Sequence, residues 1–219
     1  MDISIVTGTI NRLNLLKTKI IPNTVDNDDN VELILVDGGS TDGTIEYINN
    51  LNHPRITLLP QGKKQHYGEF MNVGLRKAFE SDTSYIAQWN DDVWLECSWS
   101  DIRKHFDDHK VYLFSWKRSQ DTDYHHWDGC LNFGLVHKDI YKELGLYDTR
   151  YRFYGPDFDF TTRMHCFGHK IKILPDIKVT ELPRQALYSD TWTGQDDKYD
   201  PENKAYYERK ELPPWIERI

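Results

Sequence analysis

The stretch 31–45, VELILVDGGSTDGTI, most constrains what this chain can fold into. Residues Leu33 to Val36 are all apolar and predict a buried strand. The strand ends at Asp37, and after two glycines Ser40 or Asp42 can N-cap a helix. Open α/β sheets bind ligands at the carboxyl ends of their strands. Asp37 is therefore a candidate binding residue, and a turn in which its carboxylate only caps backbone amides is the alternative.

Apolar runs of strand length alternate with helical patterns along the first part of the chain. Strands are predicted at 3–6, 31–36, 56–59 and 84–89, and helices at 13–21, 42–51 and 68–80. This alternation favours a mostly parallel sheet with right-handed crossovers and helices on both faces. Later helices are predicted at 100–109, 139–144, 155–167 and near 201–211, and later strands at 111–116, 131–136, 171–174 and 177–180.

We predict an α/β fold in a single compact domain spanning 1–219. The domain would comprise a first half to residue 95, a second half over 96–180 and an irregular C-terminal wrap over 181–219. The 27 Lys and Arg against 35 Asp and Glu argue against broad nucleic-acid or anionic-membrane binding, and they leave room for a local phosphate pocket.

The cysteines and the apolar runs indicate the compartment. The three cysteines have no CxxC spacing, which favours reduced thiols over a disulfide framework or a zinc site. No basic-then-apolar leader precedes the first strand, and no run approaches the ~18 apolar residues of a membrane span. We therefore expect a cytoplasmic protein with no integral membrane segment.

Three polar clusters follow predicted parallel strands, at Thr7 to Arg12, at Asp37 and at Asn90 to Asp92. Because the carboxyl ends of parallel strands share one edge of a sheet, we expect the clusters to converge. Adjacent carboxylates at Asp91 and Asp92 repel each other, which favours a bound cation. Oxygen ligands suit Mg²⁺ or Mn²⁺. A solvated Asn-Asp turn is the alternative.

The order and spacing of five motifs resemble the large family of inverting nucleotide-sugar glycosyltransferases with the GT-A (Rossmann-like) fold, the glycosyltransferase family 2-like enzymes. The matching segments are Thr9-Ile10-Asn11-Arg12, the DGGSTDGT run at 37–44, Gly68, Asn72, Gly74, Leu75 and Ala78, Asn90-Asp91-Asp92 at the place of the DxD motif, and the pair 145–148 and 154–159. The resemblance covers roughly residues 1–180.

The resemblance implies transfer of a sugar from a nucleotide-sugar donor to a hydroxyl-bearing, carbohydrate-type acceptor with inversion, and family habit favours UDP. The half to residue 95 would bind the donor, and 96–180 would hold the acceptor and the catalytic base. The implied donor-binding residues are Thr9, Asn11, Arg12, Asp37, Asn72, Asn90 and Asp91, with Asp92 as ligand of Mn²⁺ or Mg²⁺.

Asp157 matches the family's general base, which would deprotonate the acceptor hydroxyl. Carboxylates in the first turn of a helix are also stabilised by free amides and the helix dipole, so a purely structural role explains Asp157 and Asp159 equally well from the residues alone. Trp127, Asp128 and Asp159 are expected in the acceptor pocket. Aromatic rings near Trp127 that only pack beneath a long loop are the alternative.

The chain departs from the family pattern at several positions. Asn90 replaces the usual first aspartate, and Pro156 replaces a glutamate. Met71 stands where arginine is common, which leaves Lys63, Lys64 or Arg12 to pair with the donor diphosphate, and Glu181 stands near the place of a further metal ligand. Two rival functions remain: a sugar nucleotidyltransferase, which could share the sheet architecture, and a catalytically silent nucleotide- or sugar-binding protein, which the departures suggest. The first should carry a glycine-rich basic phosphate loop, of which 7–12 is a poor version.

Overall fold

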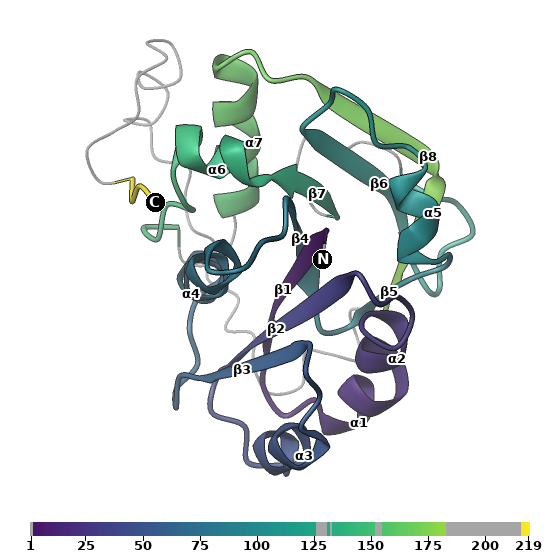
Figure 1. Ribbon diagram of the computed structural model, residues 1–219, viewed down its shortest axis with the longest axis vertical. Coiled ribbons are helices and arrows are strands. Elements are labelled where there is room, and N and C mark those ends of the chain that lie inside the picture. The colour runs from purple at the N-terminus through teal and green to yellow at the C-terminus, as the bar shows by residue number, and fades with distance from the viewer. Residues whose placement is uncertain (1, 126–130, 132, 152–154, 183–215) are drawn as a thin grey trace.

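The computed structural model describes residues 2–125, 131, 133–151, 155–182 and 216–219. Within these residues, eight strands form one sheet in the order β3-β2-β1-β4-β7-β6-β8-β5 (Figure 1). The strands are β1 (Ile3–Thr9), β2 (Val31–Asp37), β3 (Ile56–Pro60), β4 (Tyr85–Asn90), β5 (Val93–Leu95), β6 (Val111–Arg118), β7 (Gly134–His137) and β8 (Ile171–Glu181).

Parallel pairing dominates the first half of the sheet. Strands β3, β2, β1 and β4 are parallel neighbours, and β6 is parallel to β8. Strand β7 runs antiparallel to β4 and β6, and β5 runs antiparallel to β8. The predicted α/β fold with a mostly parallel sheet is confirmed. One sheet continues through both predicted halves, so the boundary near residue 95 is not a break in the hydrogen-bonded framework.

Helices cover both faces of the sheet (Figure 1). They are α1 (Leu13–Leu15), the π-helical turn η1 (Leu16–Ile20), α2 (Ile21–Asn23), α3 (Thr44–Leu51), α4 (Tyr67–Phe79), α5 (Trp99–Arg103), α6 (Lys138–Leu144) and α7 (Pro156–Cys166). One apolar cluster joins η1, α3 and α5 to the sheet, and a second joins α4, α6 and α7 to its opposite face. The apolar side of each helix thus packs against one of these two clusters.

Several boundaries differ from the sequence prediction. The first helical segment extends through Asn23, because Pro22 lies in the first turn of α2, where its missing amide is tolerated. Helix α3 begins at Thr44 with Gly43 as its N-cap, so neither Ser40 nor Asp42 holds that position. Helix α5 is shorter than predicted, and the two strands predicted over 171–180 form the single strand β8 with an irregular register.

Helix α4 lies unusually close to strand β1 because Gly74 has no side chain. A Cβ atom at Gly74 would be 2.2 Å from Cγ1 of Val6. A Cβ atom at Gly8, near the end of the same strand, would be 2.8 Å from the Phe70 ring. The close approach therefore sets the first turn of α4, with Tyr67 and Phe70, over the carboxyl end of β1.

The described C-terminal residues 216–219 return to the α4 and α6 side of the molecule (Figure 1). Ile216 is buried, the amide of Leu146 donates to the Glu217 carbonyl at 2.8 Å, and Arg76 Nε bonds the Glu217 carboxylate at 2.7 Å. The helix predicted near 201–211 lies outside the described residues. No helix in the part of the chain that the structure describes is long and apolar enough to cross a membrane.

Candidate functional site

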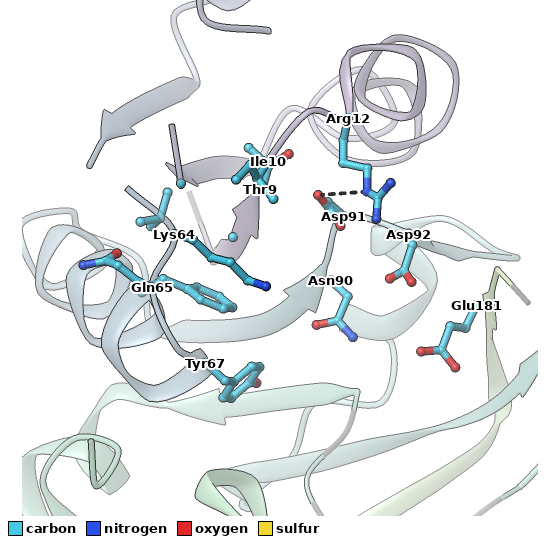
Figure 2. A pocket seen from close by; sticks show the side chains of 14 residues that line it. Thr9, Ile10, Arg12, Lys64, Gln65, Tyr67, Asn90, Asp91, Asp92 and Glu181 are labelled. Carbon is cyan, nitrogen blue, oxygen red and sulfur yellow. Dashed lines mark ion pairs between the residues drawn. The ribbon is translucent and has the colours of Figure 1, made fainter. Parts of the chain in front are cut away.

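A cavity of about 350 Å³ opens at the carboxyl edge of the parallel strands. Residues from the ends of β1, β2 and β4 meet there with the first turn of α4 and the last residue of β8 (Figure 2). The lining residues are Gly8, Thr9, Ile10, Arg12, Val36, Gly38, Lys64, Gln65, Tyr67, Phe70, Asn90, Asp91, Asp92 and Glu181. The expected convergence of the polar clusters is thus observed, because parallel register brings Thr9 beside Asp37 and Gly8 beside Asn90.

Asp37 is fully buried and is not itself among the residues that line the cavity. Its Oδ1 accepts hydrogen bonds from the amides of Gly39 and Ser40, each at 2.9 Å, and the Ser40 hydroxyl donates to its Oδ2. The residues on either side of it, Val36 and Gly38, line the cavity. In the structure Asp37 therefore fixes the turn after β2, as the capping interpretation of the sequence describes.

Asn11 ties the loop after β1 to the turn after β2. Its backbone has a φ of 53°, a left-handed conformation that asparagine tolerates better than most residues. The Asn11 amide donates to the Ser40 hydroxyl at 2.9 Å, and its side-chain oxygen accepts from the Thr41 amide at 2.7 Å. Asp42 completes the link by accepting from the Leu13 amide at 3.0 Å. Asn11 thus shapes the loop that carries Thr9 and Arg12.

Three acidic side chains, Asp91, Asp92 and Glu181, lie at one end of the cavity, and the Asp91 carboxylate points toward Arg12 (Figure 2). Burial, together with the charges of Asp91 and Glu181, raises the pKa of Asp92 to about 8. Burial also raises the pKa of Asp91 to about 6, against the lowering effect of the Arg12 guanidinium and the Thr9 hydroxyl. Arg12 Nε lies 4.0 Å from Asp91 Oδ2. This end of the cavity is electrostatically unfavourable in its ionised form, which is the setting that a cation relieves.

The carboxylates fit a divalent cation only as part of a ligand set. Within the described ranges, no group of three or more His, Cys, Asp or Glu side chains is arranged to hold a metal ion. Mg²⁺ and Mn²⁺ commonly use one or two protein carboxylates and take their other ligands from water and substrate phosphates. Asp92, with Asp91 and Glu181 also lining the cavity, has the kind of carboxylate oxygens that such a shared site would use.

Asp157 lies in the first turn of α7 and is half-buried. It is not among the residues that line the cavity. Its charge helps to raise the pKa of Tyr67 and of Tyr147, after burial, which has the larger effect on both. Tyr67 lines the cavity, and its ring makes an edge contact with that of Tyr147 at 5.7 Å between centroids. The Asp157 carboxylate is therefore within electrostatic range of Tyr67, a residue of the cavity wall.

Asp159 and Asn72, both expected to contact a ligand, are not among the residues that line the cavity. Asp159 is buried and pairs with Arg163, whose Nη2 lies 2.8 Å from the carboxylate and also donates to the Leu146 carbonyl at 2.9 Å. Asn72 is buried too, and its amide group exchanges two 2.9 Å hydrogen bonds with the backbone of Tyr147. Together they attach the segment 144–148 to α7 on one side and to α4 on the other.

Sequence reasoning missed the aromatic wall of the cavity. Tyr67 and Phe70 come from the first turn of α4, where they could have been recognised as large rings just after a polar loop that follows a parallel strand. Glu181, which the family pattern had placed only loosely, lies in the cavity because β8 ends opposite Val93 in β5. Met71 of α4 is buried in the apolar cluster between the helices and the sheet. Trp127 and Asp128 lie outside the described residues.

A mostly parallel α/β sheet with an acidic cavity at its carboxyl edge agrees with the GT-A fold of glycosyltransferases. Residues 4–172 match the family model of glycosyl transferase family 2. The chain therefore belongs to glycosyl transferase family 2. No curated protein gives a significant match.

Solved structures share the fold of this chain. S. aureus TarS 1-349 in complex with UDP has a TM-score of 0.63 and 16% identity, covering 84% of this chain and 61% of TarS 1-349. The mannosyltransferase PcManGT from Pyrobaculum calidifontis, in complex with GDP-Man and Mn²⁺, has a TM-score of 0.63 and 16% identity, covering 82% of this chain and 56% of its own. The present chain thus spans less than two thirds of either relative.

Proposed function

We propose that this chain transfers a sugar from a nucleotide-sugar donor, with UDP favoured, to a hydroxyl-bearing acceptor with inversion of the anomeric configuration. The observation that carries the proposal is the cavity at the carboxyl edge of the sheet, in which Asp91, Asp92 and Glu181 face basic side chains from other elements. This pattern suits a diphosphate that is held with a divalent cation. Membership of glycosyl transferase family 2 supports the same reaction class.

The donor would bind along the ends of β1, β2 and β4. Thr9, Arg12, Asn90 and Asp91 line the cavity and are proposed to contact it. Asp37 is proposed to act near the nucleotide base, next to the cavity-lining Val36 and Gly38. Asn11 is proposed to act mainly through the loop that it holds, since its side-chain oxygen already accepts from the Thr41 amide.

Asp92 is proposed to hold Mn²⁺ or Mg²⁺, with Asp91 and Glu181 close to it. When bound, such an ion supplies Lewis-acid stabilisation of the departing diphosphate. PcManGT, whose structure contains GDP-Man and Mn²⁺, supports this choice of cofactor class.

Asp157 is proposed as the general base. In a direct displacement, the acceptor oxygen forms a bond to the anomeric carbon as the bond from that carbon to the diphosphate oxygen breaks, and the acceptor proton passes to the Asp157 carboxylate. Asp157 is half-buried and its charge acts on Tyr67 of the cavity wall, which supports this role. Trp127 and Asp128 remain proposed acceptor contacts.

Thermal unfolding with UDP, GDP, dTDP and CDP, each with and without Mn²⁺, tests the donor site. The structures of TarS with UDP and with UDP-GlcNAc make UDP the first choice. A ligand at ~100 times its dissociation constant stabilises a protein by about 2.7 kcal/mol, or about 5–10 °C for a chain of this size. The proposal predicts such a shift with one nucleotide, larger with Mn²⁺ and absent in Asp92→Ala. No shift with any of the four nucleotides would contradict it.

A further inference from the structure

The charges of the cavity are unevenly distributed between its two sides (Figure 2). Asp91, Asp92 and Glu181 occupy one side, and the Arg12 guanidinium lies beside Asp91 with Nε 4.0 Å from the carboxylate. Lys64 lines the opposite side, and its ammonium extends into the cavity toward Asn90 (Figure 2). An anion bound in the cavity would thus lie between Lys64 on one side and the three acidic residues on the other.

The backbone that carries Lys64 is fixed by the turn after β2. The Gln61 amide donates to the Asp37 carbonyl at 2.8 Å. Gly39 has a φ of +95°, and a Cβ atom there would lie 3.1 Å from the Gly62 carbonyl, so only glycine allows this close packing of the two loops. A Cβ atom at Gly38 would lie 3.5 Å from the Cα of Lys64. The loop therefore holds the base of the Lys64 side chain at the mouth of the cavity.

The other lysine of the loop and the basic residues of α4 do not line the cavity, whereas Lys64 does. Lys63, its neighbour in the loop, is exposed and does not line the cavity. Helix α4 carries its basic residues, Arg76 and Lys77, in its last turn, and Arg76 pairs with Glu217 there. Met71 in the same helix is fully buried in the core. The first turns of α4 thus bring no cation to the cavity.

We infer that Lys64 binds the diphosphate of the donor from the side opposite Asp92. The inference rests on the proposed function and names the residue of this chain that supplies the counter-charge. A lysine ammonium is a compact charge on a flexible stem and binds phosphate oxygens without requiring one fixed geometry. Lys64 therefore acts on the phosphates and not on the nucleoside.

Comparing UDP with uridine isolates the phosphate contact. Dissociation constants of both are measured by calorimetry in the presence of Mn²⁺ for the wild type, Lys64→Met, Lys64→Arg and the matched control Lys63→Met. Lys64→Met is expected to weaken UDP binding about 10- to 100-fold, the usual effect of losing a charge-assisted hydrogen bond, and to leave uridine binding unchanged. Lys64→Arg should recover most of the loss, and Lys63→Met should stay within about 3-fold of the wild type.

The outcomes separate this inference from the proposed function. If the wild type binds UDP and Lys64→Met binds it equally well, the assignment of Lys64 is wrong and the proposed function stands. Equal losses for UDP and uridine, or an equal loss in Lys63→Met, would also overturn the assignment. If the wild type binds none of UDP, GDP, dTDP and CDP, the proposed function fails and the assignment fails with it. Unfolding temperatures without ligand should be the same for all four proteins, because both lysines are exposed.

Discussion

Neutralising Asp92 should stabilise the protein when no ligand is present. Burial and the neighbouring charges of Asp91 and Glu181 raise the pKa of Asp92 from 3.8 to about 8 in the folded state. Below pH 3.8 the carboxyl is protonated in both the folded and the unfolded chain and contributes nothing to the pH dependence. As the pH rises from 3.8 to about 8, only the unfolded chain gains from ionisation, so the wild type loses stability over this window.

The size of the effect follows from the same shift. Each pKa unit corresponds to 1.36 kcal/mol, so about three units between the unfolded value and pH 7 set a ceiling of about 4 kcal/mol. Relaxation around the charge and the burial of the replacing amide reduce this gain. We expect Asp92→Asn to be about 1–2 kcal/mol more stable than the wild type at pH 7, which raises the unfolding temperature by about 2–8 °C.

Thermal unfolding in the absence of metal at pH 5, 6, 7 and 8 measures the difference between the two proteins. Asp101→Asn is the matched control, since Lys104 and Ser98 hold the pKa of Asp101 well below its usual range. Asp101 is thus ionised in both states throughout this pH interval, and loss of its capping interactions should lower the unfolding temperature by an amount that does not vary with pH. The reasoning is refuted if Asp92→Asn is less stable than the wild type at pH 8, or if its advantage is the same at pH 5.

Three further substitutions test the packing around the site, each by urea unfolding. Arg163→Met should lower the unfolding free energy by about 3–5 kcal/mol, because it removes the guanidinium that pairs with the buried Asp159 carboxylate; a loss below 1 kcal/mol would argue against the buried pair. Gly134→Ala should lower it by more than about 2 kcal/mol, since the new Cβ would lie 2.1 Å from a β6 carbonyl oxygen, whereas Gly38→Ala, with no contact under 3.5 Å, should not destabilise comparably. Asn72→Ala should lower the unfolding free energy by about 1–3 kcal/mol and leave the UDP dissociation constant unchanged. A changed dissociation constant would instead support the direct donor contact expected from the sequence.

The parts of the fold that follow a simple period could be predicted from the sequence. The run ending at Asp37 is continuously apolar and of strand length, and the apolar stripe of α4 keeps helical spacing, so their type and approximate bounds are as expected. Parallel register then brings the end of β1 beside the ends of β2 and β4, which explains why separate polar clusters meet in one cavity. The three-residue strand β5 was missed because so short a segment carries no period.

Side-chain direction within the site was harder to predict. Asp157 and Asp159 both lie in the first turn of α7, and their position in that turn alone does not tell which of them faces the core. The signal for Asp159 was Arg163 four residues later, the spacing of an ion pair on one helix face. Asn72 follows the buried Met71 in α4, and its position within the apolar stripe indicates a buried tie instead of a ligand contact.

Release of a nucleoside diphosphate from a panel of nucleotide sugars tests the central claim most directly. The assay is run with Mn²⁺ and a set of hydroxyl acceptors, for the wild type and for Asp157→Asn, with donor binding measured in parallel. The account predicts that the wild type releases the diphosphate from one donor. Asp157→Asn should bind this donor normally but release the diphosphate about 10²- to 10⁴-fold more slowly. A wild type that binds a donor and releases nothing from it would indicate a binding protein, and an Asp157→Asn variant as active as the wild type would show that the base lies elsewhere.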